Sequence, residues 1–146
     1  MGKSGKFINR WKNLSYNGKV IFLKSVICLS LIKAGLALLP FAAFRKVFHW
    51  ITSTSTVKEV SQQQIELTVW AVDTAANLLP FELLCLPRAL ATKYLLRKAP
   101  FLTLEIGIEV NPAKHFEAHA WVENNGTVIM GKWPESVSYH RLWAWT

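Results

Sequence analysis

The sequence lacks the features that mark several protein classes. It has only two cysteines, Cys28 and Cys85, among 146 residues, which are too few for a disulfide scaffold or for a zinc site made of cysteines. It has no glycine-rich loop that could hold a phosphate group, and no set of His, Cys and carboxylate residues at metal-ligand spacing. We therefore expect a reduced, cytoplasmic chain that uses no metal and no other cofactor.

Acidic residues are absent from the first third of the chain, because the first carboxylate is that of Glu59. Residues 1–58 contain ten Lys and Arg, whereas residues 59–146 contain seven basic and nine acidic residues. Such a segment favours an anionic partner, for example a membrane surface or an acidic protein, although scattered lysines are most often only a solvated face. No recognised nucleic-acid-binding module accompanies the charge, so we expect no nucleic acid.

A long uninterrupted apolar run is also missing. Residues 20–44 are rich in apolar side chains, but Lys24, Lys33 and Pro40 interrupt them, whereas a membrane-spanning helix needs about 20 consecutive apolar residues. The apolar segment begins too late for a secretory signal. We interpret it as a buried or membrane-surface helix, so the protein could associate with a membrane through residues 1–58.

Hydrophobic residues make up 51% of the chain and include seven Trp, which excludes intrinsic disorder. Apolar side chains at helical spacing predict helices, and alternating apolar side chains further along predict strands. We therefore expect an α+β domain in which helices precede a small antiparallel sheet. The expected helices cover residues 7–11, 19–39, 41–52, 57–79 and 86–98, the expected strands cover residues 102–108, 116–123 and 127–130, and residues 134–146 are expected to fold back over the core.

Turn-forming residues divide these elements. The Asn-Gly pair at positions 17–18 predicts a turn before the first long helix, and the one at positions 125–126 predicts a two-residue hairpin turn between strands. The Ser/Thr run at residues 52–56 predicts a linker. We thus expect a basic N-terminal helical region at residues 1–52 and a core domain at residues 57–146.

Cys85 stands where the helix predicted after Pro80 begins. Pro87 follows two residues later, and proline fits the first turn of a helix because the N–H groups there have no helical acceptor. These free N–H groups and the helix dipole would stabilise a thiolate and lower its pKa. A small buried cysteine among leucines is the more common outcome of such spacing. Cys28 lies inside an apolar helix without these features and is expected to be core packing.

His119 lies within the strand predicted at residues 116–123. One side of that strand is uniformly apolar and is expected to face the core; it carries Phe116, Ala118, Ala120 and Val122. His119 lies on the other side between two carboxylates, where it suits a general base, although a surface histidine is the simpler reading. A cysteine at a helix start, followed about 34 residues later by a strand histidine, is similar to the arrangement of papain-like and transglutaminase-like enzymes.

Several segments carry a closer resemblance. They are Leu79-Pro80, Leu84-Cys85-Leu86-Pro87-Arg88-Ala89-Leu90-Ala91, Leu95-Leu96-Arg97, Leu104-Glu105-Ile106-Gly107-Ile108, Ala118-His119-Ala120-Trp121-Val122-Glu123, and Leu39-Pro40-Phe41 followed by Arg45. Together they resemble the lasso-peptide maturation protease, in the form that is split from its leader-recognition domain. The resemblance implies a transglutaminase-like cysteine peptidase that removes the leader of a ribosomally made precursor, with Cys85 as nucleophile and His119 as base.

The resemblance also implies partners and a third catalytic residue. The partners are the precursor leader, a separate leader-recognition domain protein and an ATP-dependent cyclase. The family has an Asp about a dozen residues beyond the histidine, but this chain has Gly131 there. The predicted register pairs Glu123 with Val128, Trp121 with Met130 and His119 with Lys132. Glu135 is the predicted third member, with Glu123 as second choice and a backbone carbonyl or Asn as further options; Trp121 and Glu117 are predicted substrate contacts.

Two other functions stay open at this point. An acyl-transferring enzyme of the same superfamily would use the same Cys–His chemistry with a different acceptor. A catalytically degenerate member would mainly bind the leader or a membrane surface. The missing Asp favours the degenerate member, whereas the intact pair of Cys85 and His119 argues against it.

Overall fold

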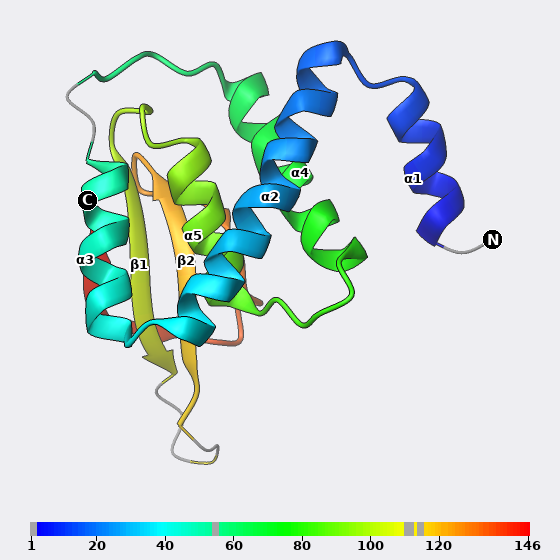
Figure 1. Ribbon diagram of the computed structural model, residues 1–146. Helices are drawn as coiled ribbons and strands as arrows, with labels where there is room; N and C mark the ends of the chain where they lie inside the picture. Colours follow the sequence, from blue (N-terminus) through cyan, green and yellow to red (C-terminus); the bar gives the residue numbers. More distant parts are fainter. Residues whose placement is uncertain (1–2, 54–55, 110–112, 114–115) are drawn as a thin grey trace.

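The computed structural model describes residues 3–53, 56–109, 113 and 116–146 of the chain. In these residues helices precede one antiparallel sheet, consistent with the predicted α+β class (Figure 1). The helices are α1 (Lys3–Lys12), α2 (Tyr16–Leu38), α3 (Phe41–Thr52), α4 (Gln62–Leu78) and α5 (Cys85–Leu95), and the strands are β1 (Leu102–Glu109), β2 (Ala118–Asn124), β3 (Thr127–Met130) and β4 (Tyr139–Trp145).

Proline and serine residues set the helix boundaries. Pro40 separates α2 from α3, and α3 has the predicted bounds. The Asn-Gly pair at positions 17–18 is not the predicted turn, because the Ser15 hydroxyl accepts a hydrogen bond from the first turn of α2 at 3.2 Å and caps the helix there. Ser61 caps α4 in the same way, so α4 begins later than predicted.

The sheet has the order β3-β2-β1-β4, and all neighbouring strands are antiparallel. The tail at residues 134–146, expected only to fold back over the core, contains β4. This strand pairs with β1 and places Trp145, 7% exposed, against the core. The sequence of β4 mixes aromatic and charged residues without alternation, which is why its strand character was not predictable from periodicity.

A bulge changes the register of the hairpin between β2 and β3. The observed pairs are Val122 with Met130, Glu123 with Val128, and Asn124 with Thr127. Glu123 therefore pairs as predicted, but the predicted pairing of Trp121 with Met130 is wrong, because β3 gains one residue relative to β2 at this point. The alignment that placed Lys132 opposite His119 is lost with it.

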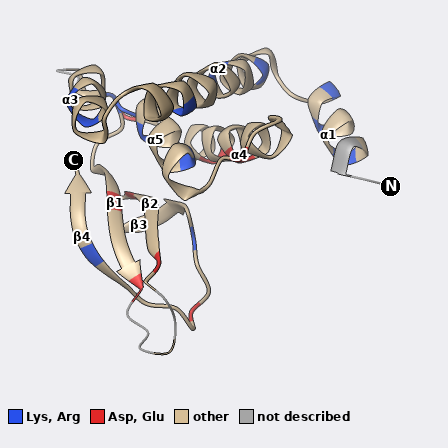
Figure 2. Ribbon diagram, turned by 60° about the horizontal axis from the view of Figure 1, so that its bottom comes forward, with Lys and Arg blue, Asp and Glu red and all other residues tan. Residues whose placement is uncertain are grey.

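Helix α5 lies at the centre of the molecule. It contacts three of the four described strands, β1, β2 and β3, and also α2, α3 and α4. Figure 2 shows the helices gathered on one side of the sheet. Ala89, Leu90 and Ala91 of α5 are completely buried. The ammonium group of Lys93 donates a hydrogen bond to the Leu102 carbonyl at 2.7 Å, which joins the last turn of α5 to the start of β1.

The apolar side of β2 faces the core along only part of its length. Ala120 and Val122 are buried, as predicted. Ala118 is exposed, and Phe116 just before the strand is 75% exposed, which corrects the expectation that this whole side faces the core. The reason is that β1 and β2 extend beyond the helical layer, as Figure 1 shows.

The other side of β2 is covered as well, by a polar network. The indole N–H of Trp121 donates to the carboxylate of Glu123 at 2.8 Å. Arg141 of β4 donates to the same carboxylate at 2.7 Å and lies 3.7 Å from the carboxylate of Glu105 on β1. Both carboxylates are nearly inaccessible to solvent, so Arg141 compensates buried negative charge and ties the three strands together.

Candidate active site

Cys85 is the first residue of α5, and Leu84 is the N-cap. This is the position predicted from Pro87, which lies in the first turn of the helix. The backbone N–H groups of Leu86 and Ala120 both interact with the thiol sulfur. The thiol is therefore placed where two backbone N–H donors, one from the helix and one from β2, stabilise negative charge.

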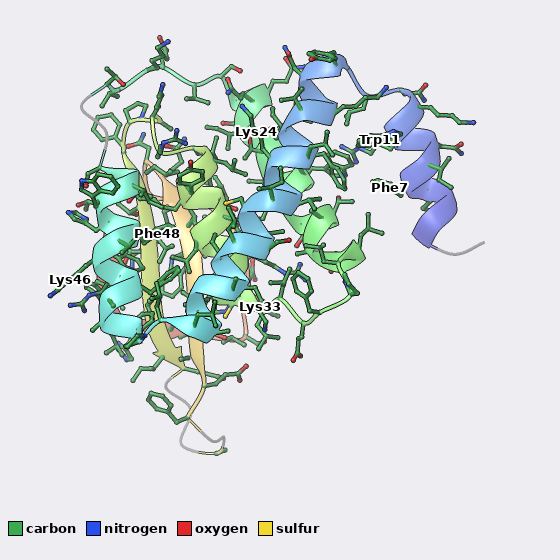
Figure 3. All side chains as sticks on the ribbon, in the orientation of Figure 1. Phe7, Trp11, Lys24, Lys33, Lys46 and Phe48 are labelled. Carbon is green, nitrogen blue, oxygen red and sulfur yellow. The ribbon has the colours of Figure 1, made fainter. Side chains whose placement is uncertain are left out.

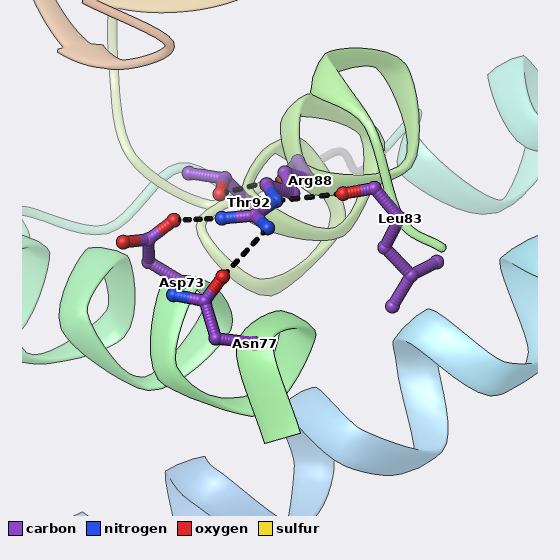
Figure 4. Close-up of polar contacts among 5 residues, drawn as sticks. All are labelled: Asp73, Asn77, Leu83, Arg88 and Thr92. Atoms are coloured by element: carbon purple, nitrogen blue, oxygen red, sulfur yellow. Dashed lines mark hydrogen bonds and ion pairs between the residues drawn. The ribbon is translucent and has the colours of Figure 1, made fainter. Parts of the chain in front are cut away.

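Arg88 fixes the turn that carries Cys85 (Figure 4). Its guanidinium donates to the Leu83 carbonyl at 2.9 Å and to the side-chain oxygen of Asn77 at 2.9 Å, and it forms an ion pair with Asp73. These bonds hold α5, α4 and the loop before the thiol as one unit. Arg88 was assigned no role from the sequence, although an Asp and an Asn one helical turn apart on the preceding helix are a recognisable pattern for an Arg partner.

His119 extends from β2 and shares a hydrogen bond with the thiol of Cys85. This bond is the largest influence that lowers the pKa of Cys85; burial opposes it, and the N–H groups of Ala120 and Leu86 add to it. The same bond is the largest influence that raises the pKa of His119, against burial, with help from a backbone carbonyl and the charge of Glu117. Both shifts favour a thiolate and an imidazolium.

The carbonyl oxygen of Gly131 lies 2.7 Å from Nε2 of His119. A carbonyl oxygen only accepts, so this hydrogen bond requires the proton to be on Nε2 and leaves Nδ1 available to the thiol. The peptide group thus orients the imidazole as a carboxylate does in the family pattern. Because it is neutral, it stabilises the imidazolium less than an Asp would.

The backbone at Gly131 cannot accept the Asp of the family pattern. Its φ of +83° lies in the left-handed region, which residues with a Cβ rarely adopt. A Cβ there would also stand 2.8 Å from the carbonyl oxygen of Ala120. Gly131 is therefore required by the same backbone geometry that brings its carbonyl to His119.

The two carboxylates predicted as third catalytic member are placed elsewhere. Glu135 is exposed in the connection between β3 and β4, and no hydrogen bond or ion pair joins it to His119 within the described residues. Glu123 accepts hydrogen bonds from Trp121 and Arg141 instead. Of the options named from the sequence, a backbone carbonyl contacts the ring, as the bond to Gly131 shows.

Aromatic side chains enclose the imidazole of His119. Tyr139 stacks on it at 4.9 Å between ring centroids, Trp121 stacks at 6.1 Å, and Trp133 meets it edge-on at 5.7 Å. Trp121 is only 1% exposed, so it supports the histidine and offers no surface to a substrate, contrary to the prediction. Glu117, the other predicted substrate contact, is exposed. Aromatic faces also favour the charged imidazolium.

The transglutaminase-like superfamily matches residues 35–144, which run from the end of α2 into β4. The chain belongs to the transglutaminase-like superfamily. That superfamily includes cysteine peptidases and acyltransferases. No curated protein and no solved structure matches this chain. The boundary predicted between residues 52 and 57 stays a prediction.

Two cavities meet at the Cys–His pair of this superfamily member. The larger, about 660 Å³, lies between α4, β3 and the first turn of α5, and it includes Glu66, Asp73 and Trp70. The smaller, about 310 Å³, lies between the end of α2 and the beginnings of α5 and β2. Cys85 and His119 line both cavities. An extended peptide can therefore run past Cys85 and His119, with one half of the peptide in each cavity.

The second cysteine has a different environment. Cys28 is 8% exposed inside α2, and burial raises its pKa to about 12, in agreement with the prediction of core packing. No group of three or more His, Cys, Asp or Glu side chains suits a metal ion in the part of the chain that the structure describes.

Proposed function

We propose that this protein is a cysteine peptidase that removes the leader from a ribosomally synthesised lasso-peptide precursor. The observation that carries the proposal is the hydrogen-bonded pair of Cys85 and His119, with a lowered thiol pKa and a raised imidazole pKa. Membership of the transglutaminase-like superfamily supports cysteine chemistry of this kind. The finer assignment to a leader peptidase rests on the sequence segments around these two residues.

In this mechanism the thiolate of Cys85 attacks the carbonyl carbon between leader and core. The carbonyl oxygen takes up the electron pair, and N–H groups of the first turn of α5, that of Cys85 among them, are available to stabilise it. The intermediate collapses, and the amine of the core leaves with the proton from Nδ1 of His119. The leader remains as a thioester on the sulfur.

Water completes the reaction. Nδ1 of His119, now neutral, removes a proton from water while the oxygen attacks the thioester carbon. The sulfur leaves as thiolate, the leader departs with a free carboxyl group, and the imidazolium is restored. The Gly131 carbonyl keeps the proton on Nε2 throughout, so only Nδ1 exchanges protons with the thiol, the amine and the water.

The proposal includes the partners that the family resemblance implies. A separate leader-recognition domain protein would hold the leader, and an ATP-dependent cyclase would consume the core whose amine the cut frees. The two cavities at the pair are large enough to take a few residues on either side of the cut bond. No metal or cofactor has a part in these steps.

The experiment that tests the proposal combines this protein with a lasso precursor and its leader-recognition protein, and follows the peptides by mass spectrometry. We expect a leader with a free carboxyl end and a core with a free amine. Cys85→Ala and His119→Ala should yield neither, whereas Cys28→Ala should cleave normally because Cys28 lines neither cavity at the Cys–His pair. Cleavage that persists in Cys85→Ala would contradict the proposal.

The same experiment separates the acyl-transfer alternative. When a short peptide amine is added, hydrolysis still gives the free leader, whereas a transferase gives leader joined to that amine. The thioester is common to both reactions, so the acceptor alone distinguishes them. A protein whose Cys85 is no more reactive than an ordinary thiol, and which cleaves nothing, would instead be the degenerate binding member.

A further inference from the structure

Helix α2 carries apolar side chains around its whole circumference, with a few lysines among them, but other helices cover only one side of it. Its length and composition would allow it to cross a membrane, yet only 28% of its most apolar 18-residue window is buried. Phe22, Leu29 and Ile32 are buried, and α2 packs against α4 and α5 on that side. A helix that is apolar all round normally lies in a protein core or in lipid. The uncovered side of α2 would therefore be stabilised by contact with an apolar surface.

The uncovered side forms one wall of a groove. The groove, about 560 Å³ in volume, lies between α2 and α3 with the end of α5 as part of its floor. Several of its large apolar side chains are exposed to solvent rather than packed. These are Ile27 (60% exposed), Leu31 (67%), Leu39 (43%), Val47 (51%) and Ile51 (41%). We call this surface the α2–α3 groove. Exposed apolar surface of this extent marks a binding region.

Positive charge accompanies the groove. Lys24 and Arg97 line it, and Figure 3 shows Lys24, Lys33 and Lys46 on the helices that form it. No Asp or Glu occurs anywhere in α1, α2 or α3, and Figure 2 shows bands of Lys and Arg on these helices. Long basic side chains beside an apolar surface can reach phosphate groups while their carbon chains lie along the lipid.

We propose that the α2–α3 groove and its basic residues dock this protein on an anionic lipid bilayer. The exposed apolar residues would enter the boundary between headgroups and acyl chains, and the lysines would contact lipid phosphates. The helix lies on the bilayer rather than across it, because one side of α2 holds the core together through residues such as Leu29 and Ser25, both 0% exposed. Docking does not depend on peptidase activity.

The orientation has a consequence for the substrate. Lys33, near the end of α2, donates a hydrogen bond to the Glu82 carbonyl at 3.0 Å and also lines the smaller cavity beside Cys85. The docking helix therefore borders the cavity that meets the Cys–His pair. A bilayer on the α2–α3 groove would thus contact the same helix that borders this cavity.

Co-sedimentation with vesicles tests this proposal on the whole protein. We expect binding to vesicles that mix phosphatidylglycerol with phosphatidylcholine, weak binding to phosphatidylcholine alone, and weaker binding as salt increases. Leu31→Glu should lower the affinity at least about tenfold, because it places a charge where an apolar side chain enters the lipid. Lys24→Ser should lower it about fivefold, as expected for one basic residue at an anionic surface.

Matched variants make the outcome decisive. Leu142→Glu on β4 and Lys132→Ser after β3 change equally exposed residues that do not line the groove, so both should bind vesicles like the unmodified chain. Circular dichroism checks that each variant is folded. The proposal would be overturned if the control and groove variants lost vesicle binding equally, or if the unmodified chain did not bind anionic vesicles. A dimer without lipid that Leu31→Glu converts to a monomer would also overturn it, because the groove would then be covered by a second copy.

Discussion

The pKa values of the two cysteines of this protein are shifted in opposite directions. Cys28 lies in the middle of α2, where burial raises its pKa to about 12. Cys85 lies at the start of α5, where the hydrogen bond to His119 and two backbone N–H groups lower its pKa despite partial burial. Both are helical, and both pack against the same hydrophobic core. The comparison indicates that the end of a helix, together with one partner on the sheet, sets the direction in which the pKa of a thiol shifts.

The physical reason lies in the backbone. In the middle of α2 every nearby N–H is already paired within the helix, so a thiolate at Cys28 would have only burial acting on it, apart from a weak attraction to Arg97. At the first turn of α5 the N–H groups are free. The imidazole of His119 adds the partner charge. Four predictions test this comparison.

The largest expected effect is the difference in alkylation rate between the two thiols at pH 7. With a pKa of about 12, roughly one Cys28 thiol in 10⁵ is ionised at that pH. We expect Cys85 to react at least about a thousandfold faster, with Cys28 reacting only on unfolding. Timed labelling of Cys28→Ala and Cys85→Ala by mass spectrometry measures each thiol separately. Similar rates for the two thiols would break the comparison.

The second prediction concerns the pH dependence of Cys85. Its pKa is lowered mainly by the bond to His119, so His119→Ala should move the pKa of Cys85 up toward the ordinary thiol value. The thiolate is then lost at neutral and weakly acidic pH but regained at alkaline pH. We expect labelling of His119→Ala to be about a hundredfold slower than that of the unmodified chain at pH 6 and nearly equal to it at pH 10. The difference in rate is smaller than the difference in ionised fraction, because a thiolate of lower pKa is a weaker nucleophile.

His140→Ala is the matched control for that experiment. His140 of β4 pairs with Ile108 of β1 and does not line either cavity at Cys85. Its variant should give the same profile as the unmodified chain. A profile shifted equally by both variants would mean that the shift comes from loosened structure and not from the imidazole beside the thiol.

The third prediction separates the role of the Gly131 carbonyl from simple backbone strain. Gly131 and Gly126 have nearly the same φ, +83° and +80°, but a Cβ at Gly131 meets the Ala120 carbonyl at 2.8 Å while one at Gly126 meets nothing within 4 Å. Gly126→Ala should cost about 1 kcal/mol of unfolding free energy from strain alone. Gly131→Ala should cost about 2 kcal/mol more and slow labelling of Cys85 about tenfold at pH 6, because the carbonyl moves away from His119.

Thermal unfolding and alkylation of these two variants give both numbers. If Gly131→Ala loses stability but labels at the rate of Gly126→Ala, the carbonyl does not orient the imidazole. Gly131→Asp is informative as well. We expect it to be less active than the unmodified chain, because the backbone cannot hold an Asp in this position without moving.

The smallest expected effect comes from Arg88. Its bonds to Asp73, Asn77 and the Leu83 carbonyl hold the turn before Cys85, so Arg88→Lys, which keeps the charge but not the fork of donors, should slow labelling of Cys85 about threefold. The unfolding free energy should fall by about 1 kcal/mol. Asp73→Asn is the companion variant and should have a smaller effect, because the carboxylate is half exposed. This order would be contradicted if Asp73→Asn lowered the labelling rate of Cys85 or the unfolding free energy more than Arg88→Lys does.

The elements with strong periodicity were predictable from the sequence. The bounds of α3 and β3 agree with the predicted ones, because Pro40 and the Asn-Gly turn at positions 125–126 define them locally. The strand β4 and the bulge in β2–β3 were not predictable in this way. Each depends on pairing with residues distant in sequence, and a bulge of one residue leaves the local pattern unchanged.

The sequence by itself determined the elements that carry the two residues of the proposed catalytic pair. Pro87 after Cys85 specifies a helix start, and His119 within an alternating segment specifies a strand, because both signals are local. Only the tertiary structure decided which group contacts the imidazole, since the Gly131 carbonyl meets it beyond a register shift between two strands. It also decided that Glu123 and Trp121 are buried and that one side of α2 is uncovered. Which atoms meet, and which surfaces stay open, depends on packing between distant segments, which local sequence patterns do not encode.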